Sequence, residues 1–164
     1  MLQPEMGGMD TREAYLFYEA GQAVAAAHLG LRIRRVSGDA VGAPTEIVVP
    51  RNRPKMQMIL WLTGMAAERK GLGRSHPLRR MRNRVRVRAL LDGTIARMTG
   101  SKAKRAAARR AMLSQAQDRA NAICGHLFAA IEELAERLRR GEAVSGAEVV
   151  AMVRAVKEGS GGMT

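Results

Sequence analysis

The chain has 164 residues, of which 46% are hydrophobic and only 3% aromatic, so one domain with a core of small aliphatic side chains is expected. Such a composition favours helices over sheets. A single cysteine excludes an intramolecular disulfide, and no apolar run approaches the ~20 residues of a membrane span. We therefore expect a mainly α, cytoplasmic protein without a membrane segment.

The net charge of +13 is concentrated in the middle of the chain. Residues 51–110 carry eighteen basic and two acidic side chains, a balance of +16, whereas the segments on either side are slightly acidic. This asymmetry is typical of a surface that faces a polyanion. A high arginine content also follows from a GC-rich genome, in which case the basic face is only solvated.

The first predicted helix runs from Asp10 to Gly30. Asp10 is a good N-cap, Glu13 follows at the spacing of a capping box, and Gly30 tolerates the left-handed backbone that ends a helix. Inside this helix lies Tyr18-Glu19-Ala20-Gly21-Gln22, which has the form of H-E-x-G-H with both histidines replaced.

Two short runs after this helix, residues 31–36 and 45–49, alternate well enough to be strands. Residues 38–44 between them have turn chemistry, so a small β-hairpin is expected. A hairpin of two strands is not stable alone in water and must pack on helices.

Pro54 is well placed in the first turn of a second helix, which Gly71 and Gly73 are expected to end. This helix is apolar nearly all round from Met56 to Ala67, a pattern typical of a central, buried helix. Its methionines are interpreted as core filler.

Seven arginines and no acid occupy residues 74–88. The R-V-R-V-R repeat within this run has period two, which allows a strand. We prefer a helix from about Leu78 to Met98, because L-R-R-M-R and A-L-L-D-G-T-I-A-R-M suit one.

The longest predicted helix starts at Gly100-Ser101 and reaches about Arg140, with Gly125 as the point where it bends or divides. A capping box at Ser145 opens the last helix, and residues 159–164 are expected to be a disordered tail. The chain is therefore interpreted as a single domain, residues 1–158.

Three segments, taken in order, resemble the peptidase domain of FtsH-type ATP-dependent zinc proteases. They are Y-E-A-G-Q-A-V-A-A-A-H-L-G from Tyr18, L-T-G-M-A-A-E from Leu62 and L-A-E-R-L-R-R-G-E-A-V-S-G-A-E-V from Leu134. They are similar to the family's H-E-A-G-H-A-V helix, its G-x-x-A-E block and its closing pattern of helix, turn and capped helix. The resemblance spans most of the chain and implies a helical FtsH-type peptidase-like domain with a small β-hairpin after the first helix.

In the intact motif, two histidines on one helix face hold a zinc ion while the neighbouring glutamate acts as general base. The resemblance puts Tyr18 and Gln22 at the histidine positions and Glu19 at the position of the base. It makes Asp92 the candidate for the third ligand. Tyrosine binds zinc appreciably only as phenolate, and a glutamine carbonyl is a weak neutral donor, so we expect no cofactor and a catalytically inactive domain.

Other interpretations of these residues stay open. If no zinc is bound, Glu19 has no catalytic role as a base and is expected to be buried in a structural polar pair with a tyrosine. Glu68 is likewise interpreted as a structural acid. His28, His76 and His126 could supply metal ligands from elsewhere, although none is on the right turn of the first helix. Zinc is the cofactor if the family site works with such atypical ligands.

The basic run is the second candidate site, for a nucleic acid or an acidic protein. Its candidate residues are Arg79, Arg80, Arg82, Arg84, Arg86 and Arg88. Phosphate binding by such a set is electrostatic and salt-sensitive, with little base readout. Three hypotheses follow: an inactive peptidase-like binding or scaffold protein, a basic nucleic-acid-binding protein, and an active ATP-dependent-type metallopeptidase with an atypical site.

Overall fold

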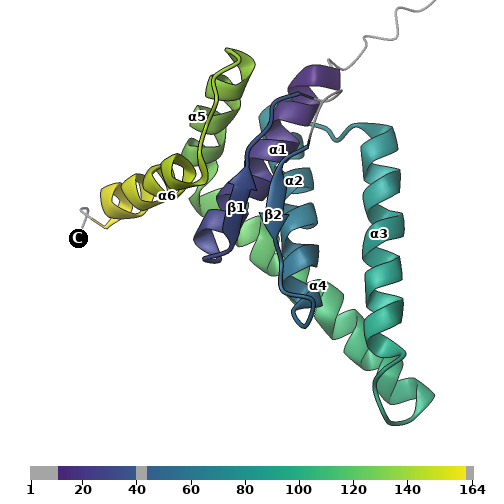
Figure 1. Ribbon diagram of the computed structural model, residues 1–164. Helices are drawn as coiled ribbons and strands as arrows, with labels where there is room; N and C mark the ends of the chain where they lie inside the picture. The colour runs from purple at the N-terminus through teal and green to yellow at the C-terminus, as the bar shows by residue number, and fades with distance from the viewer. Residues whose placement is uncertain (1–10, 40–43, 162–164) are drawn as a thin grey trace, which may run out of the picture.

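The computed structural model describes residues 11–39 and 44–161. These residues form six helices and one two-stranded antiparallel sheet (Figure 1). The elements are α1 (Thr11–His28), β1 (Arg32–Arg35), β2 (Glu46–Val48), α2 (Pro54–Leu72), α3 (Pro77–Ile95), α4 (Lys102–His126), α5 (Phe128–Arg139) and α6 (Gly146–Ser160). The predicted mainly α fold with a hairpin after the first helix is confirmed.

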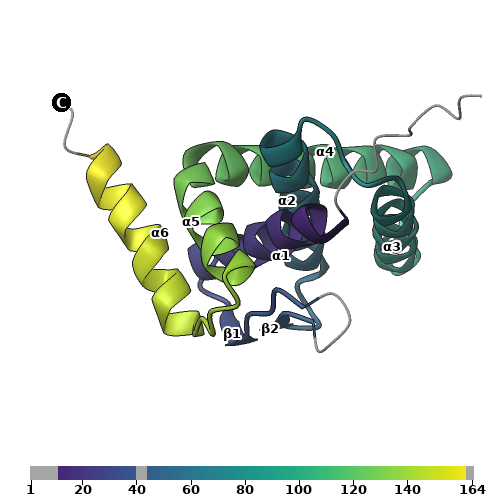
Figure 2. The ribbon, with the colours of Figure 1, turned by 90° about the horizontal axis from the view of Figure 1, so that it is seen from above.

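The two most extensively packed helices, α1 and α2, lie at the centre of the molecule (Figure 1). Helices α5 and α6 lie on one side of this pair and α3 lies on the other, while α4 spans the molecule between them (Figure 2). The hairpin packs on α1 and α6 through β1. Among the described residues, none of the helices is both long and apolar enough to cross a membrane.

Local signals set the ends of several helices as predicted. The capping box of α6 is complete, because Glu148 N donates to Ser145 Oγ at 3.2 Å and Ser145 N donates to Glu148 Oε2 at 2.7 Å. Gly30 and Gly73 adopt left-handed backbone, with φ of 69° and 75°. Pro54 is the first residue of α2.

The two ends of the chain were predicted less fully. The N-cap expected at Asp10 lies outside the described residues. Glu13 of the same expected capping box instead accepts two hydrogen bonds of 2.6 Å from the guanidinium of Arg139. Helix α6 continues to Ser160, so the expected disordered tail is helical at its start, and residues 162–164 lie outside the described part.

The arginine run is helical from Pro77 onward, and the strand that its period of two allowed does not form. The reason is a buried stripe of helical spacing, Asn83, Val87 and Leu91, which is the only part of α3 that is buried. A strand would have turned Val85 and Val87 to the same face, whereas Val85 is 64% exposed and Val87 is buried.

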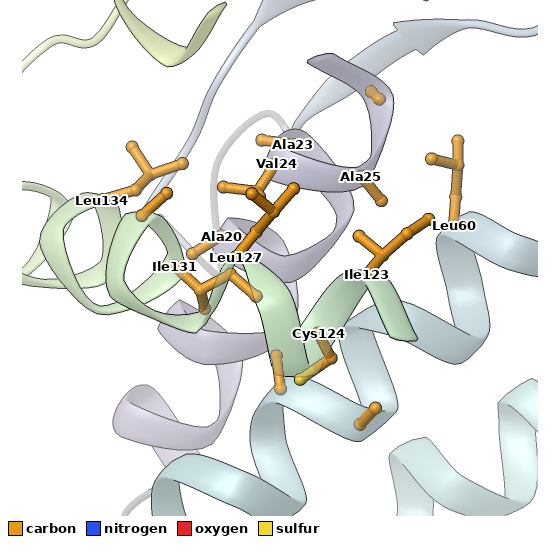
Figure 3. Packing of buried hydrophobic residues seen from close by; sticks show 14 of the residues in the cluster. Ala20, Ala23, Val24, Ala25, Leu60, Ile123, Cys124, Leu127, Ile131 and Leu134 are labelled. Carbon is orange, nitrogen blue, oxygen red and sulfur yellow. The ribbon is translucent and has the colours of Figure 1, made fainter. Parts of the chain in front are cut away.

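The long helix expected over residues 100–140 is divided in two, beside Gly125. Helix α4 ends at His126, and Leu127 leaves helical geometry at φ −112° and ψ 18°. The break turns α5 back onto α1, and the apolar stripe of Leu127, Ile131, Leu134 and Leu138 is buried there. Figure 3 shows part of this core, in which small α1 side chains such as Ala20 and Val24 meet α4 and α5.

Candidate functional site

Helices α1 and α2 cross at a pair of glycines. A Cβ atom on Gly21 would lie 2.7 Å from Cβ of Ala67, and one on Gly64 would lie 2.8 Å from Cδ2 of Tyr18. Only glycine allows the two backbones to approach this closely. The crossing therefore holds the Tyr18–Gln22 segment against the Leu62–Glu68 segment. We call this region the α1–α2 site.

Tyr18 is buried in the α1–α2 site and points to α3. Its hydroxyl donates to Oδ1 of Asn83 at 3.0 Å. The guanidinium of Arg79 lies 5.2 Å from the centroid of the Tyr18 ring and 5.6 Å from that of Tyr15. Burial raises the pKa of Tyr18 to about 12, so the side chain is a neutral phenol at physiological pH.

Arg79 and Glu68 form an ion pair at the edge of the same site. Nη1 of Arg79 lies 3.2 Å from Oε2 of Glu68, whose side chain is fully buried. The other carboxylate oxygen of Glu68 accepts a hydrogen bond from the backbone N–H of His76, immediately before α3. Glu68 thus joins α2 to the start of α3.

Glu19 is 5% exposed and faces the hairpin. Its Oε2 accepts a hydrogen bond of 3.1 Å from the backbone N–H of Thr45. The expected pairing of Glu19 with a tyrosine does not occur among the described residues, where Tyr18 pairs with Asn83. Burial raises the pKa of Glu19, while the hydrogen bonds from Thr45 act in the opposite direction.

The three expected ligand positions are not brought together. Gln22 lies one helical turn after Tyr18 and is half-buried. Asp92 lies nine residues after Asn83 on α3, roughly 13 Å further along the helix axis. Its side chain is 57% exposed and pairs with Arg109 of α4.

The chemistry of the residues present does not fit zinc. Tyr18 is a neutral phenol that donates to Asn83, and the positive charge of Arg79 beside it opposes a second cation. His28 and His126 line a separate small pocket between α1, α4 and α6. In the described part of the chain, no three histidine, cysteine or acidic side chains gather closely enough to hold a metal ion.

The basic run forms a second candidate site, a groove of about 660 Å³ between α2, α3 and α4. We call it the α3 groove. Five arginines line it: Arg69, Arg80, Arg84, Arg88 and Arg109. Only one acid, Asp118, lies among the lining residues.

The six arginines named from the sequence have three different environments. Arg80, Arg84 and Arg88 line the groove, one helical turn apart. Arg82 and Arg86 are exposed but do not line it, and Arg86 lies 6.0 Å from the ring of Trp61. Arg79 belongs to the α1–α2 site, since its side chain is 16% exposed.

Helix α3 also exposes an apolar row. Leu78, Met81 and Val85 are 60–64% exposed and follow helical spacing on the side away from its buried stripe. A row of large apolar side chains in water is unusual for a monomeric protein and is typical of a surface that binds something.

Sequence reasoning did not single out Asn83, the residue that meets both sites. It accepts the Tyr18 hydroxyl on one side and lines the α3 groove on the other. The spacing Asn83, Val87, Leu91 was the available signal, because it puts an amide on the apolar stripe of a helix.

No model of a known protein family matches the chain, and none of the curated proteins matches it significantly. The likeness to FtsH-type peptidases thus rests on the three segments that begin at Tyr18, Leu62 and Leu134.

Proposed function

We propose that this protein is a catalytically inactive relative of the FtsH-type peptidases that acts in the cytoplasm as a binding or scaffold protein. The observation that carries the proposal is the position of Arg79. Its guanidinium lies against Tyr18, the position of the first histidine in the resembling motif, and is balanced by Glu68. The local charge is thus already neutralised by protein groups.

The chemistry of hydrolysis supports the same proposal. A zinc peptidase needs its metal to lower the pKa of a bound water towards ~7 before the glutamate can use it. Glu19 faces the backbone of Thr45, and Tyr18 and Gln22 offer one neutral phenol and one neutral amide. None of these groups is a Lewis acid that lowers the pKa of a water as a metal ion does.

The binding role is supported by the surface of α3. Helix α3 buries only three residues, exposes an apolar row and supplies three of the five arginines that line the groove. The apolar row lies outside the core and is unfavourable to leave in water. Arg80, Arg84 and Arg88 of the groove are also exposed. A partner that covers them is the simplest account.

The test combines metal analysis with a proteolysis assay on the purified chain. We expect less than stoichiometric zinc after dialysis and no chelator-sensitive cleavage of unfolded casein. Glu19→Gln is the control, because any cleavage that survives this substitution comes from a contaminating protease. One zinc per chain together with cleavage that Glu19→Gln abolishes would establish an active peptidase and refute the proposal.

Nucleic-acid binding is a second candidate, favoured by the charge pattern of α3. In the described residues, Arg80, Arg82, Arg84 and Arg88 form no ion pair with an acid. Such groups can neutralise phosphates, and their affinity should fall steeply as salt rises, since binding releases counterions. Affinity for duplex DNA measured at two salt concentrations tests this candidate, and a salt-independent affinity contradicts it.

A further inference from the structure

We propose that the α3 groove binds an acidic amphipathic helix of a partner protein. The partner's carboxylates would face Arg80, Arg84 and Arg88, and its apolar face would cover the floor of the groove. The inference rests on the proposed function, because it names the kind of partner that an inactive binding domain of this shape would take.

The charges of the groove are arranged in a repeat that a helix can match. Arg80, Arg84 and Arg88 are spaced by four residues, so their Cα atoms rise along α3 by about 6 Å per step. Like charges at this spacing repel each other and destabilise α3. Glutamates at the same spacing on a second helix would meet each guanidinium in turn and remove that repulsion.

The floor of the groove is apolar and comes from three helices. Leu62 and Met65 of α2, Val87 and Leu91 of α3 and Leu113 of α4 line it. Apolar side chains at i, i+3, i+4 and i+7 of an amphipathic helix fill a groove of this kind. A phosphate backbone would leave the two half-buried members of this set, Leu62 and Leu113, in contact with water.

The lining also favours a protein over a single-stranded nucleic acid. No aromatic side chain is among the residues that line the groove, so bases have no ring on which to stack. Asn83 also lines the groove, but it is 1% exposed, so its unpartnered Nδ2 lies beneath the surface that a partner helix would contact.

Two double variants separate the groove from the general charge of α3. The groove variant, Arg84→Glu with Arg88→Glu, reverses the charge of two arginines that line the groove. The outer variant, Arg82→Glu with Arg86→Glu, reverses the charge of two arginines that do not line it. Both change the net charge equally and both alter exposed residues of one helix. Circular dichroism of each variant checks that the helical fold is retained.

The probe is a fluorescent synthetic helix of about 18 residues, with leucines at i, i+3, i+4 and i+7 and glutamates four residues apart on one flank. Two matched peptides replace the glutamates by glutamine or the leucines by serine. Fluorescence anisotropy reports binding, and a duplex of about 20 base pairs serves as the competing polyanion. Mass spectrometry of the recovered peptide and metal analysis of the protein are run on the same samples.

We expect the groove variant to bind the probe at least about tenfold more weakly than the parent, and the outer variant to change affinity by less than about twofold. Both matched peptides should bind as weakly as the groove variant does. Equal loss in the two variants, or tighter binding of the duplex than of the probe, overturns the inference in favour of nucleic-acid binding. Cleavage of the probe by zinc-loaded protein would instead refute the inactive state, whichever variant binds.

Discussion

The glycine crossing of α1 and α2 predicts a measurable cost for Gly64→Ala. The new methyl group would lie 2.8 Å and 2.9 Å from the Tyr18 ring and 2.9 Å from its backbone oxygen. The ring can turn only by leaving Asn83, and the backbone oxygen can move only if the helices separate. Overpacking of this kind costs about 1–3 kcal/mol, and loss of the Tyr18 hydrogen bond adds about 1 kcal/mol. Alanine recovers about 1 kcal/mol of helix propensity, so the net loss of unfolding free energy is about 1–3 kcal/mol.

Gly93→Ala is the matched control, because no atom lies within 4 Å of the new methyl group on α3. It should gain up to about 1 kcal/mol from helix propensity alone. Urea unfolding followed by circular dichroism measures both variants, and in a domain of this size 1 kcal/mol corresponds to about 2–4 °C in Tm. If Gly64→Ala is as stable as Gly93→Ala, the close crossing that positions Tyr18 does not exist.

Three further predictions concern the α1–α2 site. Glu19→Gln should raise the free energy of unfolding at pH 8 but not at pH 4. A carboxyl whose pKa is raised in the folded state stabilises the fold below its unfolded pKa and loses this contribution as pH rises through the folded pKa. A gain of equal size at both pH values contradicts this. Tyr18→Phe should cost about 1–3 kcal/mol, since it leaves the buried oxygen of Asn83 without a donor, and a neutral effect in urea unfolding would contradict the bond. The double variant Tyr18→His with Gln22→His should bind zinc roughly tenfold more weakly than the triple variant that also carries Asn83→Asp, because position 83 adjoins position 18. Competition with a chelator measures both affinities. Equal affinity of the double and triple variants excludes position 83 as a ligand.

The elements that local sequence specifies were predictable. Pro54 at the start of α2, the Ser145 capping box and the left-handed Gly30 each act within a few residues of themselves. The turn chemistry before Thr45 likewise predicted the hairpin. Each of these signals depends on neighbours in the chain, so no knowledge of packing was needed.

The contacts that give the α1–α2 site its character were not predictable in this way. Tyr18 and Asn83 are 65 residues apart, and their hydrogen bond depends on where α3 packs. Helical spacing could assign Asn83 to a buried stripe but could not name its partner. Asp92 was selected by its distance along the sequence, and the axis of α3 carries it away from Tyr18. Distance along a chain does not fix distance in space once a helix of unknown direction intervenes.

The environment of Arg79 explains how the two candidate sites depend on each other. Helix α3 buries only Asn83, Val87 and Leu91, so its side-chain attachment to the central pair is slight. Arg79 and Asn83 supply the polar part of that attachment, through Glu68 of α2 and Tyr18 of α1. Tyr18, at the position that the resemblance gives to the first ligand, therefore helps to hold α3 in place together with Glu68, and the direction of α3 determines the α3 groove. Under the proposed function, Tyr18 positions a binding surface through Asn83, and a histidine in its place would weaken the groove by losing this hydrogen bond.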